Sequence, residues 1–231
     1  MYTDFIQQLN NIIYQVEQSE LLESPWPHMY VKEPIKDYRM FTDYYKTPNE
    51  NLVSREEQDG RIEHVLTPVD VTTSDLRHFN KLMDRLFHTI ANKFGDDVQE
   101  APEPTVNFWT DTNKLLINDI HTDEFFDPTS YTISAMIYLP LDNTVKHYGT
   151  KLFTYIGDNI NEDAVKDEGM HQPHMAHKDK EHLWKHEVTA PYLPNTMFIT
   201  TNAKGSWHQA PTNIAEGDVR RSVMIRWKCE Y

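Results

Sequence analysis

The sequence has little of several features that define whole classes of protein. Its 231 residues contain one cysteine, Cys229, so no internal disulfide can form, and a reducing, cytoplasmic location is expected. No apolar run reaches membrane-spanning length, and no basic segment leads into an apolar stretch near the first residue. We therefore expect a soluble protein.

Positive charge is also scarce. The chain carries 22 Lys and Arg residues against 36 Asp and Glu residues, which gives a formal net charge of −14. Phosphate contacts need clustered Lys and Arg, so this balance disfavours a nucleic-acid partner. The sequence has no internal repeat, low-complexity tract or interdomain linker, and its length predicts one domain with a sizeable core.

The chain does contain a pattern that is typical of a metal site, His121-Thr122-Asp123 followed much later by His208. Two histidines and one carboxylate can hold Fe(II) on one face and leave its other positions open. Successive strand residues point to opposite faces, so His121 and Asp123 can reach one metal while Thr122 points away. The alternative is that these histidines are ordinary packed or surface residues of a barrel without iron.

The surrounding segments predict strands and two helices. Runs rich in Ile, Val and Tyr, bounded by Gly, Pro and polar turns, are expected to form strands; they cover 114–120, 131–141, the residues from 149 onward, 196–201 and 219–228. Apolar residues at helical spacing predict helices over 4–18 and 75–94. Ser74 or a neighbouring threonine can begin the second helix and Gly95 can end it. We expect this helix to cover the outside of the larger sheet.

Five short motifs follow one another along the chain: His-x-Asp at 121–123, Ile-Tyr-Leu-Pro at 137–140, Gly-Thr-x-Leu-Phe at 149–153, Ser-Trp-His at 206–208 and an Arg-rich strand at 220–227. In this order they resemble the Fe(II)/2-oxoglutarate-dependent oxygenases, especially the prolyl-hydroxylase-like branch. The resemblance implies an α+β, mainly β fold, a double-stranded β-helix (a jelly-roll or cupin-like barrel) with N-terminal supporting helices. Residues 1–231 would form a single oxygenase domain, in which 1–104 give helical support and substrate-entrance segments and 105–231 form the core.

The resemblance also implies roles for individual residues. His121, Asp123 and His208 would be the Fe(II) ligands and the catalytic centre. The co-substrate would be 2-oxoglutarate, and ascorbate is a further candidate cofactor. Tyr138 and Leu152 would line the co-substrate pocket, unless they belong to the ordinary barrel core.

A cation is needed to bind the distal carboxylate of 2-oxoglutarate, and the planar fork of an arginine does this well. Arg220 forms an Arg-x-Ser motif with Ser222, whereas Arg221 lies six residues before Trp227, as the basic residue does in several prolyl hydroxylases. Strand alternation lets only one of the two arginines point inward. If Arg220 does, the outward set is mainly apolar and suits packing against a helix; it comprises Arg221, Val223, Ile225 and Trp227. We therefore prefer Arg220 and keep Arg221 as the alternative.

A polar insert between the third and fourth predicted strands is rich in histidine, at positions 171, 174, 177, 182 and 186. Imidazole clusters bind metals, so a second metal is one interpretation, and a solvated loop or lid is the other. The insert lengthens the separation of Asp123 from His208, and it leaves the substrate class open.

The function that the resemblance implies is hydroxylation of a peptidyl proline, an amino acid or a small metabolite, with release of succinate and CO2. Arg226, Trp207 and Trp109 are candidate substrate-side residues, with packing or a surface ion pair as the simpler role for each. A non-catalytic, cupin-like ligand-binding barrel is an alternative, although it would need neither the complete ligand set nor the basic anchor. A nucleic-acid demethylase is a weaker one, because of the negative net charge.

Overall fold

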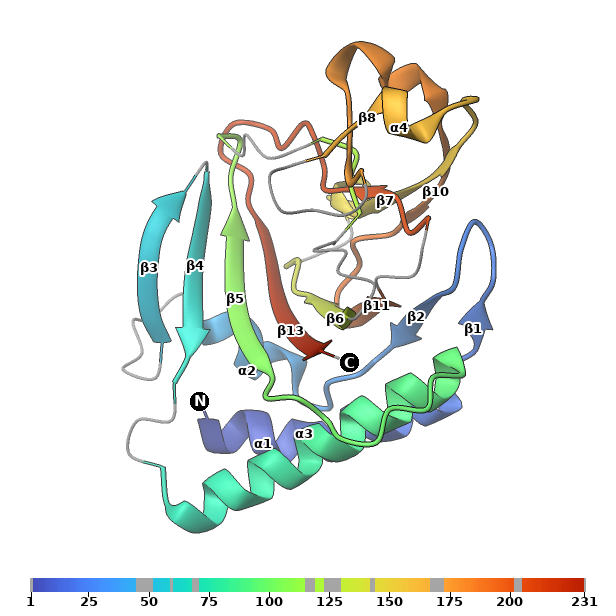
Figure 1. The fold of residues 1–231 in the computed structure, drawn as a ribbon. Coiled ribbons are helices and arrows are strands. Elements are labelled where there is room, and N and C mark those ends of the chain that lie inside the picture. The colour runs from blue at the N-terminus through green and yellow to red at the C-terminus, as the bar shows by residue number, and fades with distance from the viewer. Residues whose placement is uncertain are drawn as a thin grey trace.

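Two amphipathic helices form one layer of the molecule (Figure 1). The computed structural model describes residues 2–44, 52–58, 60–67, 71–114, 119–122, 130–141, 144–166, 173–201 and 205–230. Helices α1 (Tyr2–Gln18) and α3 (Thr73–Phe94) confirm the two predicted helices, and a short α2 spans Tyr38–Tyr44. Thr72 caps α3 by accepting a hydrogen bond from the backbone N–H of Asp75, and Gly95 ends it with φ 80°.

The second layer is a large antiparallel sheet of eight strands. In spatial order these are β1 (Leu21–Leu22), β2 (His28–Lys32), β11 (Thr196–Thr201), β6 (Ser130–Tyr138), β13 (Arg220–Glu230), β5 (Thr105–Asp111), β4 (Arg61–Leu66) and β3 (Leu52–Gln58). The mainly β fold is thereby confirmed. The N-terminal part of the chain supplies four of these strands, so it contributes to the sheet as well as to the helical layer.

A smaller sheet has the order β10 (Trp184–Ala190), β7 (Thr150–Tyr155) and β12 (His208–Gln209). Buried side chains from both sheets pack together between them, among them Tyr138 and Phe198 of the large sheet and Leu152 and Ala190 of the small one. The two sheets therefore face each other across an inner core.

The opposite face of the large sheet packs against α1 and α3. Strand β13 shows why: Val223, Ile225 and Trp227 lie in this outer core, and the Trp227 ring is 6.0 Å from that of Phe87 in α3. Alternate residues of the same strand face the small sheet. The prediction that α3 covers the outside of the larger sheet is confirmed.

The histidine-rich insert forms a separate lobe beside the small sheet (Figure 1). It contains α4 (Ile160–Asp163), the two-residue strands β8 (Ala164–Val165) and β9 (Met175–Ala176), and a 3-10 helix over Lys178–Leu183. Ala164 and Ala176 pack with Phe153 of β7 and with Trp184, so the lobe covers the outer face of the small sheet. Residues 167–172, and His171 with them, lie outside the described part of the chain.

The predicted strands at 131–141, from 149, at 196–201 and at 219–228 correspond to β6, β7, β11 and β13. The run at 114–120 does not form a strand where it is described: Lys114 lies in a turn, and Asp119 and Ile120 are irregular. Residues 115–118 of that run lie outside the described part. Among the described helices, none is both long enough and apolar enough to span a membrane.

Candidate active site

His121 and His208 are brought together by a two-residue antiparallel bridge. The backbone N–H of His121 donates to the carbonyl of His208 at 2.9 Å, and the N–H of His208 donates back at 2.7 Å. The centroids of the two imidazole rings are 4.6 Å apart. Two histidines that are far apart in the sequence therefore lie side by side.

Each of the two imidazoles contacts the backbone carbonyl of the residue two positions before it in the sequence. Nδ1 of His121 lies 2.8 Å from the carbonyl oxygen of Asp119, and Nδ1 of His208 lies 2.8 Å from that of Ser206. A carbonyl oxygen only accepts, so each Nδ1 carries the proton and each lone pair is placed on Nε2. A hydrogen bond from one ring nitrogen to a carbonyl is the usual support of a histidine that binds a metal through its other nitrogen.

The third predicted ligand, Asp123, lies outside the described residues. Within the described part of the chain, no group of three or more His, Cys, Asp or Glu side chains is placed to hold a metal. Thr122, the residue between the two predicted ligands, borders a different cavity together with Trp207 and Phe153. This placement fits the alternation from which the sequence predicted that Thr122 points away.

The two histidines open into a cavity of about 200 Å³ between the sheets. Its wall also includes Arg220, Met136, Thr150 and Arg226. Two neighbouring histidines, a buried cation and a concave volume therefore lie together, and a few polar groups gathered at one cavity are typical of a small-molecule site.

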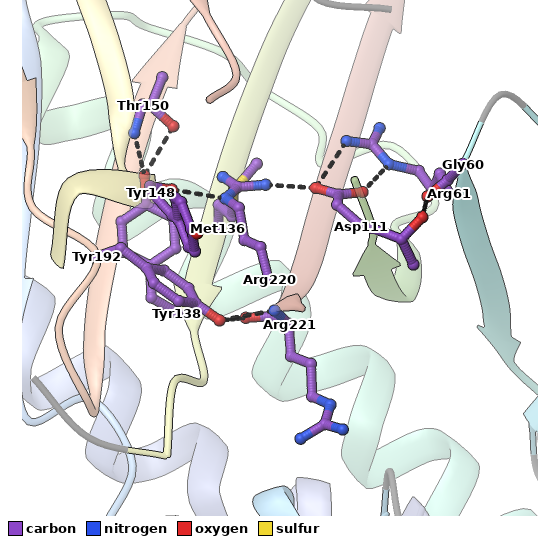
Figure 2. A network of polar contacts seen from close by, with 11 residues as sticks. Gly60, Arg61, Asp111, Met136, Tyr138, Tyr148, Thr150, Tyr192, Arg220 and Arg221 are labelled. Carbon is purple, nitrogen blue, oxygen red and sulfur yellow. Dashed lines mark hydrogen bonds and ion pairs between the residues drawn. The ribbon is translucent and has the colours of Figure 1, made fainter. Parts of the chain in front are cut away.

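Arg220 points into this cavity and is 1% exposed. Its Nε donates to the carbonyl of Tyr148 at 3.0 Å, Nη1 to Asp111 at 2.7 Å and Nη2 to the sulfur of Met136 at 3.0 Å. Figure 2 shows the Arg221 side chain leaving the strand on the other side, while its backbone exchanges two hydrogen bonds with the hydroxyl of Tyr192. Of the two arginines, Arg220 is the one that the structure places at the cavity.

Asp111, at the end of β5, is a site residue that the sequence analysis missed. Its fully buried carboxylate accepts the hydrogen bond from Arg220 and two more from Arg61, at 2.6 Å from Nε and 3.2 Å from Nη2 (Figure 2). Burial raises the pKa of Asp111, but the two guanidinium groups outweigh that effect and hold the pKa below its ordinary value. Strand alternation is the sequence signal that could have identified Asp111. Asp111 lies two residues after Trp109, a candidate substrate-side residue, so in a strand the two side chains point to the same face.

Burial and charge also oppose each other at Arg220. Burial lowers the pKa of the guanidinium group, whereas the neighbouring Asp111 carboxylate raises it, and the net pKa lies above the ordinary value. Arg220 therefore stays a cation in an almost water-free position. Arg61, on β4, stacks over the indole of Trp109 with Cζ 3.9 Å from the ring centroid.

The remaining predicted co-substrate residues lie close behind the cavity wall. The Tyr138 hydroxyl is 2.7 Å from Oγ1 of Thr150, and the Tyr138 ring lies 5.5 Å from Cζ of Arg220. Leu152 pairs with His208 across the small sheet and is buried in the inner core. Ser222 is fully buried on β13, opposite Tyr138.

The predicted substrate-side residues separate into two groups. Arg226 and Trp109 border the cavity, and Nε of Arg226 lies 3.3 Å from the hydroxyl of Ser134. Trp207 instead packs edge-on against Trp184 at 5.0 Å, beneath the insert lobe.

The histidines of the insert do not gather into a metal cluster within the described residues. His174 is buried beside β9, whereas His186 lies on β10 with Nε2 3.0 Å from the hydroxyl of Thr189. His182 belongs to the 3-10 helix and His186 to the strand that follows it, so the two do not share a helical face.

No protein-family model matches the sequence, and no curated protein matches it. Solved structures are similar in fold. The epimerase SnoN in complex with Fe3+, alpha ketoglutarate and nogalamycin RO has a TM-score of 0.50 at 12% identity, and the alignment covers 96% of this chain and 85% of SnoN. HygX from Streptomyces hygroscopicus with nickel, 2-oxoglutarate and hygromycin B bound has a TM-score of 0.50 at 9% identity, covering 87% of this chain and 82% of HygX.

A prolyl-4-hydroxylase from Pseudomonas putida aligns over 96% of this chain and 99% of its own, with a TM-score of 0.48 and 12% identity, values too low to assign this chain to that branch. At such identities the likeness concerns the fold. This chain has the fold of iron- and 2-oxoglutarate-dependent oxygenase-like proteins, as its motifs predicted.

Proposed function

We propose that this protein is an Fe(II)- and 2-oxoglutarate-dependent dioxygenase that hydroxylates an organic substrate and releases succinate and CO2. The observation that carries the proposal is the meeting of His121, His208 and Arg220 at one cavity. In this account the two facing sheets form a double-stranded β-helix, and residues 1–231 act as a single domain.

The donor set fits ferrous iron. Both imidazoles present Nε2 lone pairs from rings fixed by backbone carbonyls, and a carboxylate completes a facial triad. Asp123 follows His121 by two residues, so we assign it as that carboxylate. The iron and 2-oxoglutarate with which SnoN was crystallised, and the 2-oxoglutarate and nickel bound to HygX, support the same cofactors here.

The cavity also fits a dicarboxylic acid. Arg220 supplies a permanent, buried cation at the cavity wall, and charge-assisted hydrogen bonds from such a cation are about twice as strong as neutral ones. Its sulfur partner, Met136, is a weak acceptor that a carboxylate oxygen can replace. Arg220 is therefore the anchor that we assign to the distal carboxylate, with Ser222, Tyr138 and Leu152 shaping the wall behind it.

When bound, Fe(II) with 2-oxoglutarate would supply the oxygen-activating chemistry that hydroxylates a C–H bond. The chain's own residues hold and orient the reactants. His121 and His208 fix the metal, and Arg220 sets the direction of the co-substrate. Trp26 shields one side of the site, because its ring lies 6.4 Å from that of His208 and its indole N–H donates to the carbonyl of Trp207 at 3.3 Å.

The substrate that we propose is a small organic molecule, an amino acid or other metabolite, with a peptidyl proline as the alternative. The cavity of about 200 Å³ has Trp109 and Arg226 on its wall. SnoN and HygX are described with nogalamycin RO and hygromycin B, so this fold accommodates small molecules.

Succinate release tests the proposal. Purified protein would be incubated with Fe(II), 2-oxoglutarate and O2, with amino acids and small metabolites added singly. We expect succinate from the wild type and a faster release with a true substrate. His208→Ala should abolish succinate formation, whereas His186→Ala, a histidine change on the outer strand β10, should leave it unchanged. Equal succinate formation by the wild type and His208→Ala would contradict the proposal.

A further inference from the structure

Asp111 sits between two arginines from different strands of the large sheet. Arg220 of β13 donates to its Oδ2 at 2.7 Å, and Arg61 of β4 meets both of its oxygens, at 2.6 and 3.2 Å. The carboxylate is fully buried, Arg220 is 1% exposed, and the Arg61 side chain is 28% exposed. Arg61, Arg220 and Asp111 form what we call the β4–β13 charge triad (Figure 2).

The charge of this triad decides whether Arg220 can attract an acid. A buried pair of Arg220 and Asp111 is electrically neutral, so it would offer an incoming carboxylate hydrogen bonds but no net charge. Interactions between charges are strong in a poorly solvated site, so a missing net charge there is costly for anion binding. Arg61 adds a second cation and brings the triad to one net positive charge, which matches a single carboxylate.

The position of Arg61 is fixed by its neighbours. Two of its N–H donors are held by Asp111, and its Cζ atom lies over the Trp109 ring, 3.9 Å from the ring centroid. Both Arg61 and Trp109 border the same cavity as Arg220. A stacked, doubly hydrogen-bonded arginine keeps its charge next to Asp111 with little freedom to leave.

We propose that Arg61 is a positioning residue for the co-substrate: it neutralises Asp111, so that Arg220 keeps the net charge that binds the distal carboxylate of 2-oxoglutarate. The inference rests on the proposed function. The N-terminal half of the chain then contributes to co-substrate binding through Arg61, which lies outside the five sequence motifs.

The test compares 2-oxoglutarate affinity by calorimetry under anaerobic conditions, with Fe(II) bound, in a set of charge variants. Arg61→Gln should weaken 2-oxoglutarate binding on the order of ten- to a hundred-fold, the size expected for losing one charge a few ångströms away at an intermediate dielectric constant. Arg61→Lys keeps the charge and should retain most of the affinity. Arg85→Gln, at an exposed arginine of α3 that pairs with Glu17, is the matched control and should have no effect.

The double variant Arg61→Gln/Asp111→Asn separates charge from structure. It removes one positive and one negative charge, so the net charge around Arg220 returns to that of the wild type, and the affinity should return to within a few-fold. Fe(II) affinity, measured alongside, should be the same in all variants.

Two results among the variants would overturn the inference alone. An Arg61→Gln variant with unchanged 2-oxoglutarate affinity would show that the charge of Arg61 has no part in binding. Loss of both 2-oxoglutarate and Fe(II) affinity, without recovery in the double variant, would show that Arg61 only maintains the structure. If the wild type itself bound Fe(II) but no 2-oxoglutarate, the proposed function would fail and the inference with it.

Discussion

At the scale of the residue, the main feature of the site is a buried ion pair between Asp111 and Arg220. Asp111 and Arg220 are both almost without solvent contact, yet the pKa of each is displaced towards its charged form. For both groups burial acts the other way, so the ion pairs outweigh the loss of hydration. Removing one partner would leave the other as an uncompensated buried charge.

Asp111→Asn should therefore destabilise the protein by about 3–5 kcal/mol at neutral pH, the usual cost of breaking a buried ion pair. The folded-state pKa of Asp111 is depressed, so its contribution is complete above the unfolded carboxyl value of 3.8 and is lost as pH falls through the folded pKa. Urea unfolding of both proteins between pH 2 and 7 should show the stability difference shrinking below pH 4. A difference that stays constant with pH would contradict this role.

The sequence analysis predicted Arg220 at the site and missed Asp111. The Arg-x-Ser spacing and the apolar set at Val223, Ile225 and Trp227 together favoured Arg220 as the inward residue. The position of Asp111 depends on three strands, β4, β5 and β13, meeting in one register. A local pattern does not contain that pairing, and the strand that carries Asp111 was not predicted.

At the scale of the element, the periodic segments were the predictable ones. The apolar spacing in α1 and α3 marks the face that packs on the large sheet, and both helices were located to within a few residues. The bridge that joins His121 to His208 was not predictable, because β12 has two residues and its partner is an isolated position. Tertiary contacts rather than sequence periodicity create such an element.

Leu86 tests the packing of α3. It is fully buried in the outer core, so Leu86→Ala should lower the free energy of unfolding by about 2–5 kcal/mol through lost burial and the cavity left behind. Leu76, on the same helix, is 37% exposed, and Leu76→Ala should change the stability by less than about 0.5 kcal/mol. Chemical denaturation measures both, and equal losses in the two variants would exclude the assigned helix face.

At the scale of the whole molecule, the large sheet separates two environments. One face is apolar and packs against α1 and α3, whereas the other carries Arg220, Ser222 and Arg226 toward the small sheet. The packed layer of helices therefore backs the strands that carry the cavity residues. The insert lobe lies on the outside of the small sheet, where it packs around Phe153 and Trp184.

Ligand binding to such a preformed cavity should stabilise the fold. With Fe(II) and 2-oxoglutarate present at about a hundred times their dissociation constants, mass action predicts about 2.7 kcal/mol of added stability for each ligand that binds only the folded state. In thermal unfolding under anaerobic conditions, the two ligands should raise the Tm of the wild type and leave the Tm of His208→Ala unchanged. Removal of the metal with a chelator should reverse this rise in Tm. A wild-type Tm that neither ligand changes would contradict a preformed site.

The central claim is that one cavity binds Fe(II) through His121 and His208 and 2-oxoglutarate through Arg220. Anaerobic addition of Fe(II) and then 2-oxoglutarate, followed by visible absorption, tests it most directly. We expect the weak charge-transfer band of a chelated 2-oxo acid in the wild type, its loss in His208→Ala, its weakening in Arg220→Ala and its persistence in Arg221→Ala. The absence of the band in a wild-type protein that also fails to bind iron would contradict this claim and leave a cavity that binds some other ligand.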